Sequence, residues 1–187
     1  GDRYCDIVLL KLSAGGGLLW QRTIGGEGYD APTVLEPVKD AQGNPDGYIL
    51  AAHTTSFGAG GRDIWMLRLD NDGDIVWQKT YGGGQDEFPR AVKPVAGGGF
   101  ILTADTQSLG AGGRDVWVVK LDANGTVEWE RTYGGSGLEF PAGIEPVGAE
   151  AYVVGARTSS FVTGSPDNGD FWVFKIDADG DLIWNYS

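Results

Sequence analysis

Short runs in which apolar and polar residues alternate recur along the whole chain. They are bounded by turn-forming residues rather than by helix caps, and a period of two is typical of half-buried β-strands. In the middle of the chain the pattern predicts four consecutive strands, at residues 48–55, 63–70, 74–81 and 89–95. We therefore expect an all-β chain of short strands.

One segment of this pattern is repeated. The run Asp-Ile-Trp-Met-Leu-Arg-Leu-Asp, which begins at Asp63, has close copies that begin at Asp115 and Asp170 and a degraded copy that begins at Asp6. A further tryptophan follows each copy, and these four tryptophans are 57, 52 and 55 residues apart: Trp20, Trp77, Trp129 and Trp184. A period slightly above fifty residues with four strands per period suits the blade of a β-propeller.

The turns repeat with the strands. Residues 70–73 read Asp-Asn-Asp-Gly, and residues 122–125 and 177–180 are similar. A glycine at the end of an Asp/Asn-rich turn predicts a tight hairpin with one positive-φ position.

The segment 112–135, Gly-Gly-Arg-Asp-Val-Trp-Val-Val-Lys-Leu-Asp-Ala-Asn-Gly-Thr-Val-Glu-Trp-Glu-Arg-Thr-Tyr-Gly-Gly, resembles repeats of large bacterial and archaeal β-propeller proteins, mostly surface or secreted and of unknown function. It is more loosely similar to the blades of quinoprotein-type propellers. The resemblance spans essentially the whole chain and implies a β-propeller of four-stranded antiparallel blades. It also implies an extracellular or cell-surface location.

The strand phase predicts where blades begin. We expect two complete and two partial blades, with three, four, four and three strands, at residues 1–46, 47–97, 98–149 and 150–187. The first strand of each blade carries small residues, such as Ala51 and Ala52, and is expected to be innermost. Such a segment cannot close a ring, so we expect a longer native polypeptide or another chain that completes the propeller.

Composition narrows the range of partners. The 187 residues include 32 glycines and carry a formal net charge of −12. This balance argues against nucleic-acid binding, which needs clustered basic residues. No apolar run is long enough to span a membrane. A single cysteine, Cys5, excludes an intrachain disulfide.

Acidic residues in two of the turns suggest calcium, the one cofactor with any support, because alternate carboxylates can share a hard cation. The candidate ligands are Asp70, Asp72, Asp74, Asp177, Asp179 and Asp181. The same residues are explained by a hairpin whose backbone needs Asp, Asn and Gly. In addition, the glycine precedes the third acidic residue, whereas in EF-hand and similar calcium loops it follows that residue. The hairpin role is the favoured interpretation.

Other acidic residues recur in every unit, which indicates structural roles. The aspartates that open each repeated segment are expected to accept hydrogen bonds from backbone N–H groups of adjoining loops. Asp30, Glu87 and Glu139 are expected to pair with Arg62 or Arg114.

Most of the seven tryptophans are expected in the core between blades rather than on a sugar. Residues that do not repeat are better ligand candidates, namely the inserts at 39–46 and 161–167. His53, the only histidine, is interpreted as a hydrogen-bonded residue of an inner strand.

No catalytic or cofactor-binding residue is predicted. The expected function is a noncatalytic binding or assembly module with a protein or carbohydrate partner. Two alternatives stay open: a propeller-type glycan hydrolase or lyase with its site outside this segment, and a structural subunit of a multi-chain assembly.

Overall fold

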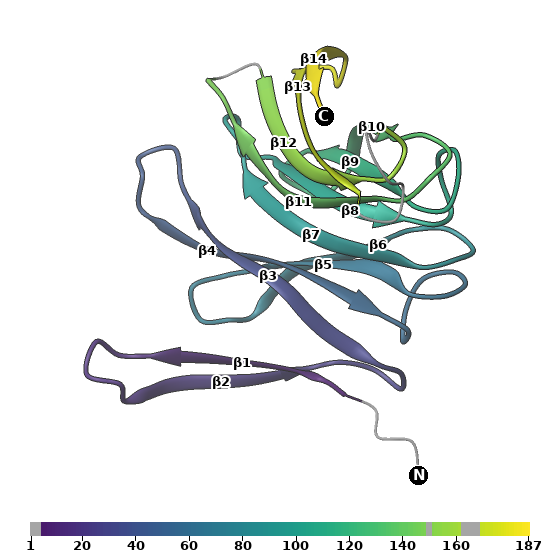
Figure 1. The fold of residues 1–187 in the computed structure, drawn as a ribbon. Helices are drawn as coiled ribbons and strands as arrows, with labels where there is room; N and C mark the ends of the chain where they lie inside the picture. Colours follow the sequence, from purple (N-terminus) through teal and green to yellow (C-terminus); the bar gives the residue numbers. More distant parts are fainter. Residues whose placement is uncertain (1–4, 149–150, 162–168) are drawn as a thin grey trace.

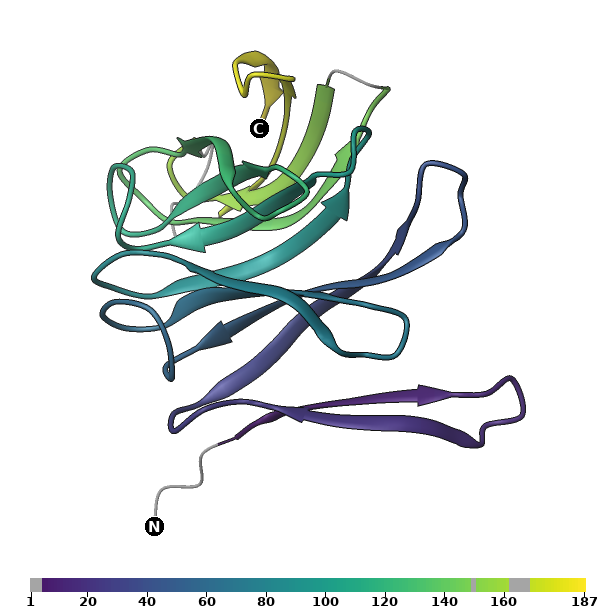
Figure 2. The ribbon, with the colours of Figure 1, turned by 180° about the vertical axis from the view of Figure 1, so that it is seen from behind.

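The computed structural model describes residues 5–148, 151–161 and 169–187, and these residues form fourteen β-strands and no helix. All strand pairs are antiparallel, and the strands form four separate sheets. The sheets follow one another in chain order, from the N-terminal hairpin to the C-terminal strands (Figures 1 and 2). The expected all-β class and the expected number of strands are confirmed. None of the described residues form a helix that could cross a membrane.

The first sheet is a hairpin, and each of the other three has four strands in chain order. The hairpin is β1 (Ile7–Leu12) and β2 (Leu18–Ile24). The second sheet is β3 (Asp30–Lys39), β4 (Pro45–Thr54), β5 (Asp63–Leu69) and β6 (Ile75–Tyr81). The third is β7 (Glu87–Pro94), β8 (Phe100–Thr106), β9 (Asp115–Leu121) and β10 (Val127–Tyr133). The fourth is β11 (Glu139–Pro146), β12 (Ala151–Thr158), β13 (Asp170–Asp177) and β14 (Leu182–Tyr186).

This pairing corrects the predicted grouping of strands. The strand expected at 89–95 closes no earlier unit; it is β7, which pairs with β8 and opens the next sheet. The strands are therefore grouped as two, four, four and four, and the sheets cover 30–81, 87–133 and 139–186 instead of the predicted units. The strand with Ala51 and Ala52 lies second in its sheet, between β3 and β5.

A buried acid at the start of each sheet explains the pairing. Glu87, with no exposed surface, accepts hydrogen bonds from Thr106 Oγ1 (2.9 Å), Ser108 N (3.1 Å) and Gly83 N (2.8 Å). These contacts fasten the first strand of the sheet to the end of the second. Asp30 and Glu139 make the same contacts with the threonine of their own sheets, Thr54 and Thr158. The predicted pairing of these three acids with Arg62 or Arg114 is wrong, because hydroxyl and backbone donors occupy their oxygens.

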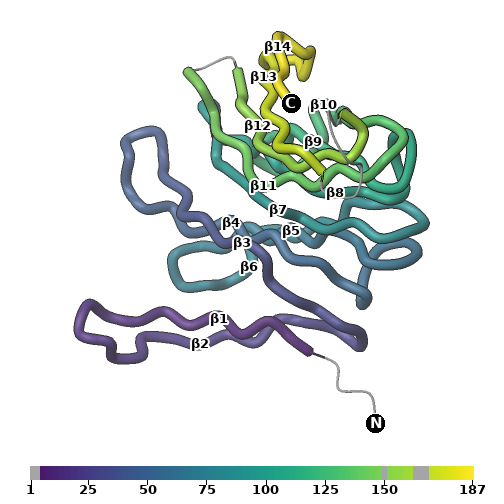
Figure 3. Tube along the Cα trace, viewed as in Figure 1, coloured from purple at the N-terminus to yellow at the C-terminus, as the bar shows by residue number. Residues whose placement is uncertain are grey.

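The sheets pack face to face and enclose three apolar cores. One lies between the hairpin and the second sheet, one between the second and third sheets, and one between the third and fourth. Successive first strands meet, because β3 contacts β7 and β7 contacts β11 (Figure 3). Trp65, Trp117 and Trp172 are buried in these cores. The other four are half-buried, so the predicted core role is confirmed in full for only these three.

Side chains of β6 and β10, the last strands of the second and third sheets, also hold the next sheet. Trp77 Nε1 donates to Ala123 O (3.0 Å) and Tyr81 Oη donates to Gly125 O (2.5 Å). Trp129 and Tyr133 repeat these bonds to Ala178 O (2.7 Å) and Gly180 O (2.5 Å). Gly125 has φ +73°, and a Cβ there would lie 2.9 Å from the Trp77 ring. The turn glycine is thus required by both the backbone and the neighbouring indole.

We predict that Glu87→Ala lowers the free energy of unfolding by about 3 kcal/mol, because the buried Thr106 hydroxyl and two half-buried backbone N–H groups lose their acceptor. Urea denaturation followed by tryptophan fluorescence measures this. Glu27→Ala, at an exposed position, is the control and should change stability by less than about 0.5 kcal/mol. Equal effects of the two substitutions would contradict the fastening role of Glu87.

Candidate functional site

The antiparallel meanders give the molecule two opposite ends. At the hairpin end lie the tight turns that join β3 to β4, β5 to β6, β7 to β8 and β9 to β10. At the loop end lie the connections from β4 to β5, β6 to β7 and β8 to β9. Residues that do not repeat gather at both ends, which makes each a candidate site.

The aspartates of the hairpin end hold their own turns. Asp70 Oδ1 accepts from Asp72 N (2.9 Å) and Asp74 N (2.9 Å). Asp122 and Asp177 make the same pair of bonds. The predicted hairpin role of these residues is confirmed.

The structure does not bring the calcium candidates together as a metal site. Across the described ranges, no group of three or more His, Cys, Asp or Glu side chains could hold a metal ion. Asp74 instead pairs with Arg22 (3.0 Å). Asp72, Asp179 and Asp181 donate backbone N–H groups to the first aspartate of their turn.

A groove of about 600 Å³ lies at the hairpin end, between the second and third sheets. One wall is the predicted ligand insert 39–46, and the other is the β7–β8 turn with Gly97 and Gly98. Trp77 and Asn124 also line it. Arg68, on the groove wall, bonds Asp46 through Oδ2 (2.6 Å) and the backbone oxygen (2.5 Å). This ion pair anchors the insert to β5.

The chain contains equivalents of this groove for comparison. Between the third and fourth sheets, a groove with Lys120 in the place of Arg68 has a volume of about 140 Å³. Between the hairpin and the second sheet, the groove beside Lys11 measures about 80 Å³. Of these three grooves, only the one between the second and third sheets has the insert 39–46 as a wall. The largest groove of the three is therefore the one lined by residues that do not repeat. The other predicted insert, 161–167, lies outside the described residues except for Phe161.

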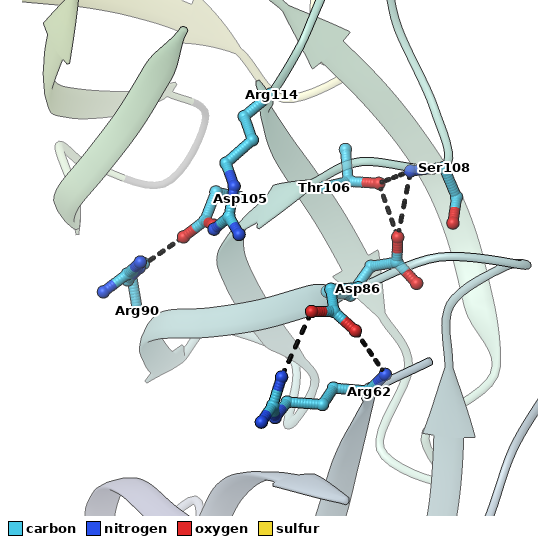
Figure 4. A network of polar contacts seen from close by, with 8 residues as sticks. Arg62, Asp86, Arg90, Asp105, Thr106, Ser108 and Arg114 are labelled. Carbon is cyan, nitrogen blue, oxygen red and sulfur yellow. Dashed lines mark hydrogen bonds and ion pairs between the residues drawn. The ribbon is translucent and has the colours of Figure 1, made fainter. Parts of the chain in front are cut away.

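The loop end carries three arginines, Arg62, Arg90 and Arg114, which we call the arginine cluster (Figure 4). Their guanidinium carbons lie 5.6, 6.0 and 5.0 Å from the centroid of Phe88. Such distances permit cation–π attraction. Two acids face the three arginines, so the cluster has one excess positive charge in a protein of net charge −12.

The two acids of the arginine cluster differ in burial. Asp86 pairs with Arg62 (3.2 Å) and also accepts from the Arg62 backbone N (2.8 Å). Asp105 is completely buried and bridges Arg90 Nε and Arg114 Nη1 (Figure 4). With its amide oriented so that Oε1 faces Arg114, Gln107 accepts two further bonds of 3.1 Å from that guanidinium. Arg114 is therefore held more completely than the other two arginines.

His53 adjoins the arginine cluster. Its ring stacks on Tyr29 (5.7 Å) and meets the edge of Phe88 (5.3 Å). Burial lowers the pKa of His53, and the charges of Arg62 and Arg90 lower it further. The imidazole is therefore neutral at pH 7. The predicted hydrogen bonding is not observed, because the buried Nδ1 has no partner in the described part of the chain.

Sequence reasoning missed the arginine cluster, although a signal was present. His53, Asp105 and Arg157 occupy one repeat position, between an alanine and a threonine that are identical in all three sheets. A position that varies within an otherwise constant segment is where function can diverge without disturbing the fold. Arg90 similarly follows a repeated proline.

The repeated aspartates beside the arginine cluster are structural, as predicted. Asp63 Oδ2 accepts from Ala59 N (2.8 Å), and Asp115 accepts from the backbone of Ala111. Gly134 lies against Asp115 and Glu139, and a Cβ there would collide with both carboxylates. Two buried acids from successive sheets thus share one glycine.

Comparison of the chain with models of protein families and with curated proteins finds no match.

The proximity of these acids predicts a pH dependence. Burial and the charge of Glu139 raise the pKa of Asp115 from 3.8 to about 6. A raised folded-state pKa makes the ionised acid unfavourable above pH 6, and this cost disappears as the pH falls towards 4. The free energy of unfolding of Asp115→Asn, minus that of the native chain, should therefore be more positive at pH 7 than at pH 4 by about 2–3 kcal/mol.

Urea denaturation at both pH values tests this, because the other titrating groups are common to the two proteins. Asp122→Asn is the control of opposite sign, since backbone hydrogen bonds lower the pKa of Asp122. The native chain should be more stable than Asp122→Asn by a larger margin at pH 7 than at pH 4. A pH-independent difference for Asp115→Asn would contradict the raised pKa.

Proposed function

We propose that this chain is a β-propeller segment that acts as a noncatalytic binding module for a glycan or a protein on or outside a prokaryotic cell. Three successive four-stranded antiparallel sheets, packed face to face with their first strands in contact, support the propeller. The cell-surface location is supported by the resemblance of the repeats alone.

The groove at the hairpin end carries this proposal. Its volume of about 600 Å³ falls within the range of about 300–1,000 Å³ that small-ligand sites occupy. An indole, an amide and an ion pair lie along it, a combination that suits the apolar faces and hydroxyl groups of sugars. We therefore favour a short neutral oligosaccharide as its ligand.

The acids of the groove support a noncatalytic role. A glycosidase needs a carboxylic acid with a raised pKa beside a second carboxylate. Hydrogen bonds from Asn44 instead lower the pKa of Asp40, so this acid stays ionised. Asp46 is engaged by Arg68. Neither acid is arranged as a proton donor.

We predict that Asp46→Ala weakens oligosaccharide binding at least tenfold, because the insert loses the ion pair that anchors it to β5 and keeps only the bond from Arg68 to its backbone oxygen. Cellotriose, maltotriose and chitotriose are the probes, and tryptophan fluorescence is the readout, since Trp77 lines the groove. Glu128→Ala is the matched control: it removes the acid that pairs with Lys120 (2.6 Å), the equivalent of Arg68. Absence of binding by all three sugars, or equal losses in both variants, would contradict the groove as a sugar site.

A structural subunit is a second candidate, favoured by two uncovered apolar faces. Val8, Leu10 and Leu12 on β1 are 53–55% exposed, whereas their counterparts on β5 and β9 are buried under the preceding sheet. At the other end, Phe171 on β13 is 71% exposed, whereas its counterpart Val116 lies in a core. Within the chain, the face that corresponds to that of Phe171 packs against the face that corresponds to that of Leu10 in the next sheet. The β13 face of one copy could therefore pack against the β1 face of a second copy, in a head-to-tail arrangement.

For this second candidate we predict self-association that Leu10→Asp abolishes, because a charge would be buried in the new interface. Sedimentation velocity over a range of protein concentrations measures it. Leu109→Asp, at an exposed position of the β8–β9 loop, should leave association unchanged. A native chain that stays monomeric throughout would remove the candidate.

A further inference from the structure

The arginine cluster has hydrogen-bonding capacity that its internal partners do not use. A guanidinium carries five N–H donors. Among the described residues, the Arg90 side chain donates through Nε alone, to Asp105, and the Arg62 side chain donates through Nη1 alone, to Asp86. Both side chains are accessible, at 38% and 41% exposed. Their remaining donors can therefore reach a ligand.

The local charge favours an anion. Three arginines face two aspartates. Burial is the main cause that lowers the pKa of neighbouring His53; the charges of Arg62 and Arg90 lower it further, and those of Asp86 and Asp30 raise it. An added negative group would balance the excess charge. Arginine is well suited to this task, because its planar fork matches the two oxygens of a carboxylate. Asp105, which accepts one hydrogen bond from each of Arg90 and Arg114, shows that these guanidinium groups already bind a carboxylate.

The surroundings indicate the rest of the ligand. Tyr29 is 39% exposed and stacks on His53 beside the arginine cluster. An aromatic face next to a cationic fork fits a sugar ring that carries a carboxylate better than an extended acidic peptide. A long polyanion would also be repelled by the net charge of −12.

We propose that Arg62 and Arg90, beside Phe88 and His53, form a site for the carboxylate of an acidic sugar. The site is at the loop end of the sheets, opposite the hairpin groove, and does not depend on that groove being a binding site. Two of its residues, Arg90 and His53, break the repeat, whereas Arg62 and Phe88 recur as Arg114 and Phe140. The proposed ligand is opposite in charge to the protein as a whole.

His53 offers a specific test because it is the only histidine of the chain. Its ring C–H signals in NMR spectra give its pKa without interference from another imidazole. A bound anion favours the imidazolium, so D-glucuronate should raise the pKa of His53 by at least about half a unit. Glucose at the same concentration, with ionic strength held by chloride, should leave it unchanged.

Variants locate the effect. Arg90→Gln and Arg62→Gln should each remove most of the glucuronate-induced rise, whereas Arg90→Lys should keep part of it, since the charge remains and the fork is lost. Arg22→Gln is the matched control, because it removes the same charge from an exposed pair with Asp74 at the hairpin end. Circular dichroism shows whether each variant is folded. Because two residues of the arginine cluster are replaced separately, the test still works if one variant does not fold.

The outcomes are distinct. A rise with glucuronate that Arg22→Gln retains and either cluster variant loses supports the proposal. If inorganic sulfate raises the pKa of His53 as much as glucuronate or more, the site binds oxyanions in general, and the assignment to a sugar carboxylate is overturned. No rise, or a rise that all variants share, would overturn the site itself. The Asp46→Ala experiment at the other end is unaffected by any of these results.

Discussion

The apolar cores between successive sheets hold this molecule together, because a four-stranded antiparallel sheet of short strands cannot enclose a core alone. The second and third sheets each bury one face under their predecessor and the other under their successor. In β6 and β10 an indole and a phenol extend the contact to the next turn: Trp77 and Tyr81, for example, bond the backbone of the following sheet. Residues in these contacts are constrained in every repeat.

This constraint separates structural polarity from functional polarity. Repeated acids have their oxygens occupied: Glu87 fastens two strands, Asp70 holds a turn, and Asp63 accepts from a loop backbone. Polar residues that do not repeat are spared these tasks. They lie at the two ends of the sheets, as the insert at 39–46 and Arg90 of the arginine cluster do, where changes do not disturb the cores.

Much of the fold could be predicted from the sequence, since alternation of apolar residues and the turn glycines depend on local geometry. Strand positions agreed closely, as with β5 at Asp63–Leu69. The grouping of strands was wrong because both the β6–β7 and β7–β8 connections are glycine-rich, and only the bonds of Glu87 to β8 distinguish them. The arginine cluster depends on side chains from two sheets meeting around Phe88, which local pattern does not encode.

The charge of the arginine cluster differs from the average of the chain for a structural reason. Several carboxylates at the hairpin end are already engaged: Asp40, Asp70, Asp122 and Asp177 accept backbone N–H groups, and Asp46 and Asp74 pair with arginines. Their number therefore says little about cation binding. At the loop end a buried Asp105 requires two guanidiniums to offset its desolvation, and those guanidiniums bring more donors and charge than one carboxylate can use. A structural need for buried ion pairing thus leaves a positive surface on an acidic protein, and this surplus is what a ligand could exploit.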